Sequence, residues 1–76
     1  MSALTTARRL LADALAMSET DLPANPRIGE ISQWDSLAHA RILLALEERI
    51  GKPLEPEQVV EVASLDDIAR VIEKYG

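Results

Sequence analysis

The chain has 76 residues, 47% of them apolar, which is enough for one folded domain and too few for two. It contains no cysteine and one histidine, so we expect neither a disulfide nor a metal site, and the lack of cysteine fits a reducing compartment. The net charge of −5 argues against nucleic acid and anionic membranes as partners, because both attract basic surfaces.

The first predicted helix begins after Ser2, a good capping residue, and ends near Met17. Its apolar residues recur at spacings of three and four and form one stripe: Leu4, Ala7, Leu11, Ala14 and Leu15. We interpret this segment as an amphipathic helix and not as a signal peptide, because Asp13 interrupts the apolar run and no cleavage-site pattern follows. No run approaches the roughly 20 apolar residues of a membrane span.

Residues 18–35 are predicted to form a long ordered loop. Pro23 and Pro26 lack backbone N–H groups and disfavour helix in the residues before them. We expect three apolar residues to pin the loop to the core: Leu22, Ile28 and Ile31. A long loop in so small a domain is costly in entropy and is often functional.

The remaining helices are predicted at 36–50, 56–60 and from Ser64 onward. Gly51 ends the first of these, Pro56 opens the short one, and Asp67 completes a capping box with Ser64. The inner stripe of the last helix is Leu65, Ile68, Ile72 and Tyr75. The expected fold is all-α, a small four-helix bundle of three main helices and one short helix with a long first loop. Because aromatic residues are rare, its core should consist of Leu, Ile, Val, Ala and Met.

The helix at 36–50 has two apolar faces. At 100° per residue, one sector holds the expected core residues Ile42, Leu43, Leu46 and Ile50. A roughly opposite sector holds Leu37, Ala40 and Leu44. Either the long loop covers this second face, with Leu37 buried near it, or the face is open for a partner.

Asp35 and Ser36 stand where this helix begins, and either can be its cap. His39 is close by in the sequence, so a small hydrolase with an acid, histidine and serine must be considered. Side chains of adjacent residues at a helix start diverge, and no glycine near Ser36 can shape an oxyanion hole. The hydrolase is therefore disfavoured, and His39 is better explained as a partly buried side chain near Ser36.

The sequence DSL at residues 35–37 resembles the attachment motif of acyl carrier proteins and of the related peptidyl carrier proteins. The longer stretch WDSLAHARILLALEERIG, residues 34–51, is similar to the second helix of that family. The similarity continues through LEPEQVVEVASLDDIARVIEKYG to the end of the chain and is weak only in the first helix. It implies one carrier domain over residues 1–76.

This resemblance implies that Ser36 receives the phosphopantetheine arm of coenzyme A from a phosphopantetheinyl transferase, and that Asp35 helps the transferase recognise the site. The thiol of the arm would carry an acyl group as a thioester. The protein would then be no enzyme itself, but would present its cargo to loading and modifying enzymes. The expected partner-facing residues are Leu37, Ala40, Arg41, Leu44, Glu47 and Glu48.

Three residues depart from the pattern of fatty-acid carriers. Ala38 and Arg41 stand where those carriers resemble one another in having acids, and Trp34 precedes the motif in place of alanine. These features resemble those of discrete carriers in polyketide, nonribosomal peptide or modified-lipid pathways. Because Arg41 should repel a basic partner, we predict that a general fatty-acid synthase uses this carrier poorly. The alternatives are an aminoacyl or peptidyl carrier and an unmodified helical interaction domain. We expect a cytoplasmic monomer, either a free-standing protein or a domain excised from a larger synthase.

Overall fold

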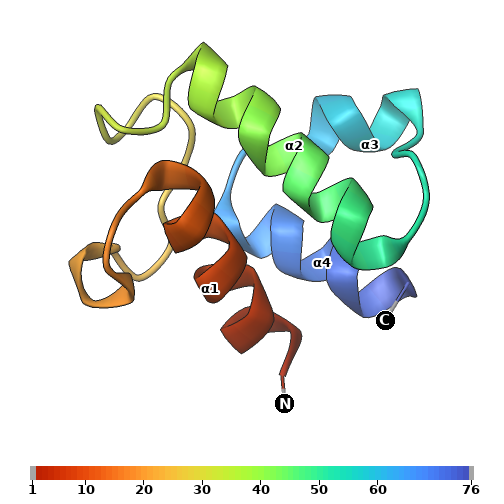
Figure 1. Cartoon of the computed structure of the whole chain (residues 1–76), viewed down its shortest axis with the longest axis horizontal. Coiled ribbons are helices and arrows are strands. Elements are labelled where there is room, and N and C mark those ends of the chain that lie inside the picture. The colour runs from red at the N-terminus through yellow and green to blue at the C-terminus, as the bar shows by residue number, and fades with distance from the viewer. Residues whose placement is uncertain (1, 76) are drawn as a thin grey trace.

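Three long helices pack against one another in the computed structural model, which describes residues 2–75. They are α1 (Ala3–Leu15), α2 (Ser36–Ile50) and α4 (Leu65–Tyr75), and α1 has its most extensive contacts with α4 and then with α2. A short α3 (Pro56–Glu61) joins α2 to α4, and a 3₁₀ turn, η1 (Glu19–Asp21), lies in the long loop (Figure 1). Residues 2–75 contain no strand, so the predicted all-α bundle with a long first loop is confirmed.

Local capping explains where the helices begin and end. The Ser2 side chain accepts a hydrogen bond from the Thr5 backbone N–H at 3.1 Å, as predicted. Helix α1 ends at Leu15, two residues before the predicted end, because Ala16 adopts the left-handed conformation with φ of 56°. Gly51, with φ of 77°, ends α2 in the same way and as expected.

The capping box predicted for α4 is also present. The Asp67 backbone N–H donates to Ser64 Oγ at 3.3 Å, and Asp67 Oδ2 accepts from the Ala63 backbone N–H at 3.0 Å. In the usual capping box the acid would accept from the backbone N–H of Ser64 itself, whereas here Asp67 accepts from Ala63, one residue earlier. No described helix is both long and apolar enough to cross a membrane.

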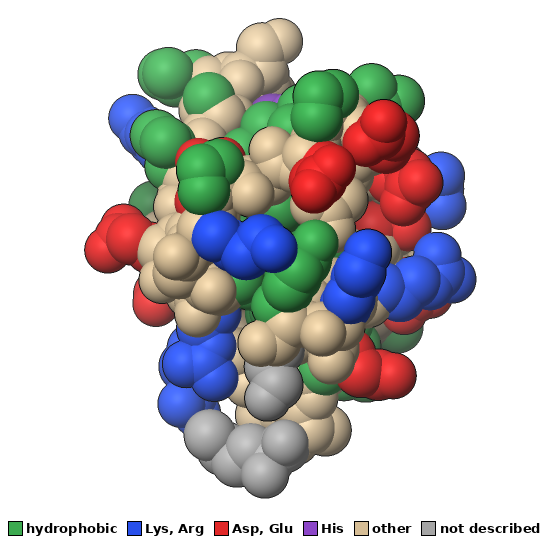
Figure 2. Space-filling view, turned by 90° about the vertical axis from the view of Figure 1, so that its right-hand side faces the viewer, with side chains coloured by type: hydrophobic (Ala, Val, Ile, Leu, Met, Phe, Trp, Pro, Cys, Tyr) green, Lys and Arg blue, Asp and Glu red, His purple; other side chains and the backbone are tan. Residues whose placement is uncertain are grey.

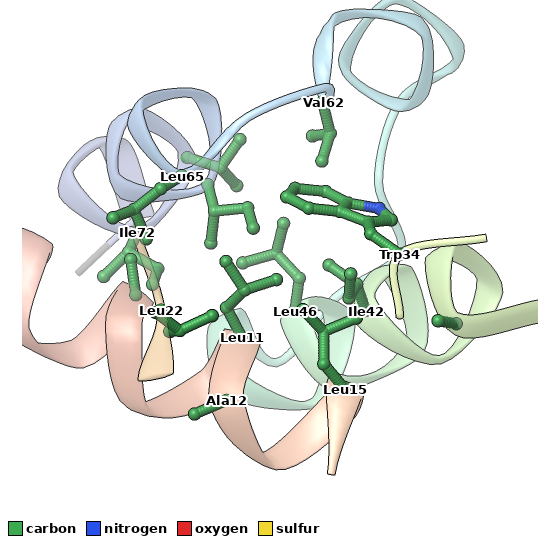
Figure 3. Close-up of a cluster of buried hydrophobic side chains, with 14 of the residues drawn as sticks. Leu11, Ala12, Leu15, Leu22, Trp34, Ile42, Leu46, Val62, Leu65 and Ile72 are labelled. Atoms are coloured by element: carbon green, nitrogen blue, oxygen red, sulfur yellow. The ribbon is translucent and has the colours of Figure 1, made fainter. Parts of the chain in front are cut away.

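Trp34 is the largest side chain among the fully buried ones, and only 1% of its surface is exposed. Its ring enters the core from the end of the long loop, between Val62 on one side and Ile42 on the other (Figure 3). The expectation of a purely aliphatic core was therefore wrong. The aliphatic members include Leu11, Leu46 and Ile68 from the three long helices, as predicted, and Leu22, Leu54 and Val62 from the connecting segments. Leu4 was expected in the inner stripe of α1 but is 46% exposed, so its inclusion was wrong.

The long loop is tied to the connection between α3 and α4. The Ile28 N–H donates to Ala63 O at 2.8 Å and the Leu65 N–H donates to Pro26 O at 3.0 Å, on either side of an antiparallel bridge. These bonds hold the backbone at Ile28, but its side chain is 40% exposed. The prediction that Ile28 pins the loop was wrong, whereas Leu22 is buried and Ile31 packs partly against the core.

Arg8 of α1 holds the first half of the loop. Its guanidinium donates to the backbone oxygens of Pro23 at 2.9 Å, Glu19 at 2.9 Å and Leu22 at 3.2 Å. One side chain thereby donates to three carbonyl groups of the loop, of which Glu19 O also accepts from the Leu22 backbone N–H at 3.2 Å. These bonds keep the loop ordered beside α1.

Candidate functional site

The candidate site is the start of α2, where the structure separates the roles of Asp35 and Ser36. Asp35 is the cap, because its Oδ1 accepts a hydrogen bond from the Ala38 backbone N–H at 2.9 Å. Ser36 is the first residue of the helix and is exposed. Within residues 2–75 its hydroxyl has no hydrogen-bond partner, so Ser36 does not serve as the cap and its Oγ faces solvent.

The helix start also offers a favourable electrostatic environment for an anion on Ser36. The first turn of α2 contains no acidic residue, and its leading N–H groups carry the positive end of the helix dipole. Asp35 opposes this effect slightly, since it is a like charge beside the serine.

The imidazole of His39 contacts Trp34 and forms no hydrogen bond with Ser36 or Asp35. Trp34 Nε1 donates to His39 Nδ1 at 3.0 Å, and the two rings stack with centroids 6.1 Å apart. Because Nδ1 accepts, the proton of the neutral ring is on Nε2. Partial burial lowers the pKa of His39 from its usual value of 6.5.

This geometry is incompatible with a Ser-His-Asp triad. A triad histidine donates from Nδ1 to the acid and accepts the serine proton at Nε2. Here Nδ1 accepts from Trp34, and the Asp35 carboxylate bonds to the backbone N–H of Ala38. His39 is therefore a partly buried structural residue, as its position in the sequence indicated.

The second apolar face of α2 is open. Leu37 is 65% exposed and Leu44 is 64% exposed, while Ala40 and Arg41 beside them are also exposed. The interpretation in which the loop covers this face and buries Leu37 was wrong. The loop reaches the core instead through Trp34, whose ring lies between Val62 and Ile42 of α2 (Figure 3).

The two acidic residues expected at the partner surface differ in their surroundings. Glu48 is exposed, whereas Glu47 is half-buried and its Oε2 accepts a hydrogen bond from the Leu54 backbone N–H at 2.8 Å. Glu47 therefore has a role inside the fold, since it fixes the start of the segment that leads to α3. Sequence reasoning missed this role because the contact joins residues on two different elements.

Exposed apolar residues continue on α3, where Val60 is 83% exposed and Val59 is 38% exposed. Figure 2 views the molecule from the side on which α3 lies, and shows hydrophobic side chains gathered along the upper edge with acidic side chains next to them. Both α2 and α3 therefore present apolar residues to solvent.

A groove of about 520 Å³ lies between α1 and α2. Three arginines line it, Arg9 from α1 with Arg41 and Arg49 from α2, together with the acids Asp13 and Glu48. Of these, only Arg41 and Glu48 were expected at a functional surface. The contribution of Arg9 could not be found from the sequence, because it depends on how α1 and α2 pack. Residues 2–75 contain no cluster of three or more groups that could hold a metal ion.

No protein-family model, no curated protein and no solved structure matches this chain. The interpretation of the site therefore rests on its own residues and geometry.

Proposed function

We propose that this protein is an acyl carrier protein of a specialised pathway, whose Ser36 bears a phosphopantetheine arm. The observation that carries the proposal is the division of roles at the start of α2: Asp35 makes the capping hydrogen bond, and the exposed Ser36 hydroxyl is left without a structural task. A transferase can therefore reach Oγ without breaking a bond that the fold needs.

The arm would supply what the chain lacks. The protein has no cysteine, so the terminal thiol of phosphopantetheine would be its only thiol, and the cargo would be attached there as a thioester. The phosphodiester on Oγ adds one negative charge at the helix N-terminus, where the dipole stabilises an anion by about 0.3–1 kcal/mol. We place the carrier in the cytoplasm, since the absence of cysteine fits a reducing compartment.

The proposed carrier is not an enzyme, and the geometry of His39 supports this. Its Nδ1 is occupied by Trp34 Nε1, so it does not serve as the base that a nucleophilic serine requires. Ala38 is buried and Arg41 is exposed, and neither is the acid of a fatty-acid carrier. We therefore place the cargo in a polyketide, nonribosomal peptide or modified-lipid pathway, with an acyl group as the first choice and an aminoacyl or peptidyl group as the alternative.

An unmodified helical interaction domain is the second candidate function. The exposed Leu37 and Leu44 favour it, because they offer a docking surface whether or not Ser36 is modified. The two functions differ in one measurable property, which is covalent modification of Ser36.

The test is the intact mass of the protein after incubation with coenzyme A and a broad-specificity phosphopantetheinyl transferase. We expect a gain of one phosphopantetheine group in the natural protein and none in Ser36→Ala. Ser32→Ala is the matched control, because Ser32 is exposed in the nearby loop and its loss should leave the modification intact. An unmodified but folded natural protein would refute the carrier function and leave the interaction domain.

A further inference from the structure

We infer that the arginine-rimmed groove between α1 and α2, with the adjoining leucines of α2, docks an acidic amphipathic helix of a partner protein. The docking surface consists of the groove, whose lining includes Arg9, Arg41 and Arg49, and of the exposed Leu37 and Leu44 beside Arg41 on α2. The docking itself does not require a modified Ser36. Its connection to cargo delivery rests on the proposed function.

The charge of the groove is opposite to that of the molecule. Three arginines and two acids line it, which is a net +1 on a chain whose net charge is −5, so the rest of the chain carries −6. Arg41 and Arg49 form no ion pair with any other residue of 2–75, and Arg9 has only a loose contact with Glu19 at 3.8 Å. These guanidinium groups are therefore available to carboxylates of a partner.

The groove has an apolar floor as well as a basic rim. Leu10 and Ala14 of α1 and Ala45 of α2 are its apolar lining residues, and all three are half-buried. A partner helix with one apolar stripe can lay that stripe over the floor and place its flanking acids near the arginines. A purely polar acidic segment would leave the floor uncovered.

The exposed leucines extend this surface toward Ser36. Leu37 precedes Arg41 by four residues and Leu44 follows it by three, so all three share one side of α2. Leu37 is also the residue directly after Ser36. A partner that covers Arg41 and the two leucines therefore lies next to the proposed attachment site, and this would guide an enzyme to the arm.

The probe for the test is a synthetic amphipathic peptide of about 15 residues, roughly 22 Å long, with leucine on one face and glutamate on the other. A matched peptide has lysine in place of glutamate. Binding is followed by the amide resonances of the isotope-labelled full-length protein. We expect the glutamate peptide to shift resonances of Arg41, Ala45 and Arg9, with affinity that falls as salt is raised. The lysine peptide should not bind there.

The variant Arg41→Glu should raise the Kd of the glutamate peptide about tenfold, because an attractive contact becomes a repulsive one. Arg27→Glu is the control, since it changes the net charge equally on an exposed residue outside the groove. Leu44→Ala should raise the Kd about threefold through the apolar contact. Helicity of each variant is checked by circular dichroism.

Four results would overturn this inference. The first is equal binding of both peptides, and the second is no shift in the groove with either peptide. The third is a shift of the groove resonances with protein concentration alone, which would make a second copy the occupant. The fourth is a shift with phosphatidylglycerol vesicles and not with the peptide, which would make the occupant a membrane. Ser36→Ala is tested in parallel, because retained peptide binding with no arm separates failure of the carrier function from failure of docking.

Discussion

Trp34 brings a polar N–H into the core, and His39 accepts its hydrogen bond. Burial disfavours the charged imidazolium, so the folded protein holds the pKa of His39 below the 6.5 of the unfolded chain. The unfolded state then binds more protons near and below pH 6.5, and stability is lost as the pH falls through that range. We expect the urea midpoint of unfolding to decrease between pH 7.5 and pH 5.5.

The variant His39→Asn isolates this effect at a single residue. The asparagine oxygen can accept from Trp34 Nε1, but it does not titrate in this range. The midpoint of His39→Asn should therefore change less over the same pH interval, while the two proteins have similar stability at pH 7.5. Parallel pH profiles for both proteins would show that His39 does not contribute.

At the scale of elements, one side-chain hydrogen bond joins α3 to α4. Gln58 is 8% exposed, its Nε2 donates to the Tyr75 hydroxyl at 2.9 Å, and its Oε1 accepts from the Glu55 backbone N–H at 2.9 Å. The variant Tyr75→Phe leaves the amide N–H groups of Gln58 without this acceptor. We expect a loss of about 1–2 kcal/mol in stability and faster hydrogen exchange at Val59 and Val62.

Phenylalanine at position 75 removes the hydroxyl but keeps the aromatic ring, so contacts of the ring do not change. Lys52 Nζ lies 4.4 Å from the centre of the Tyr75 ring, and phenylalanine retains that cation–π contact. Val60→Ala on the exposed side of α3 should change stability by no more than about 0.5 kcal/mol. If exchange in α3 is the same in Tyr75→Phe as in the natural protein, then other contacts hold α3 in place.

The elements that could be predicted from sequence are those that local chemistry decides. The Ser2 cap, the Gly51 end of α2 and the Ser64 capping box each depend on residues within four positions of one another. Contacts between distant residues could not be predicted in this way. The bonds from Arg8 to the loop and from Glu47 to Leu54 exist only once the helices have packed.

In the candidate site, too, only the local features could be predicted from the sequence. Sequence placed Asp35 and Ser36 at the start of α2, but two adjacent good caps are indistinguishable until one of them makes the bond. Burial of Trp34 also escaped prediction, since it is a loop residue at a position that any side chain can occupy locally. The groove between α1 and α2 required the packed structure, because Arg9 is far in the sequence from Arg41 and Arg49.

At the scale of the whole molecule, stability is limited by size. A domain of 76 residues has a free energy of unfolding of about 4–11 kcal/mol, and no disulfide adds to it. Leu46 is fully buried in the core, and Leu46→Ala should remove about 2–5 kcal/mol by leaving a cavity. We expect this variant to be partly or wholly unfolded at 37 °C, as measured by urea denaturation and circular dichroism.

Leu44→Ala is the matched variant, two residues away on the same helix and 64% exposed. It removes the same atoms from a surface position, so its free energy of unfolding should change by no more than about 0.5 kcal/mol. The comparison separates the two faces of α2, since one face would stabilise the bundle and the other would be free to contact partners. A loss of more than about 1.5 kcal/mol in Leu44→Ala would mean that this leucine packs against the fold in solution, and the docking surface would then have to be reassigned.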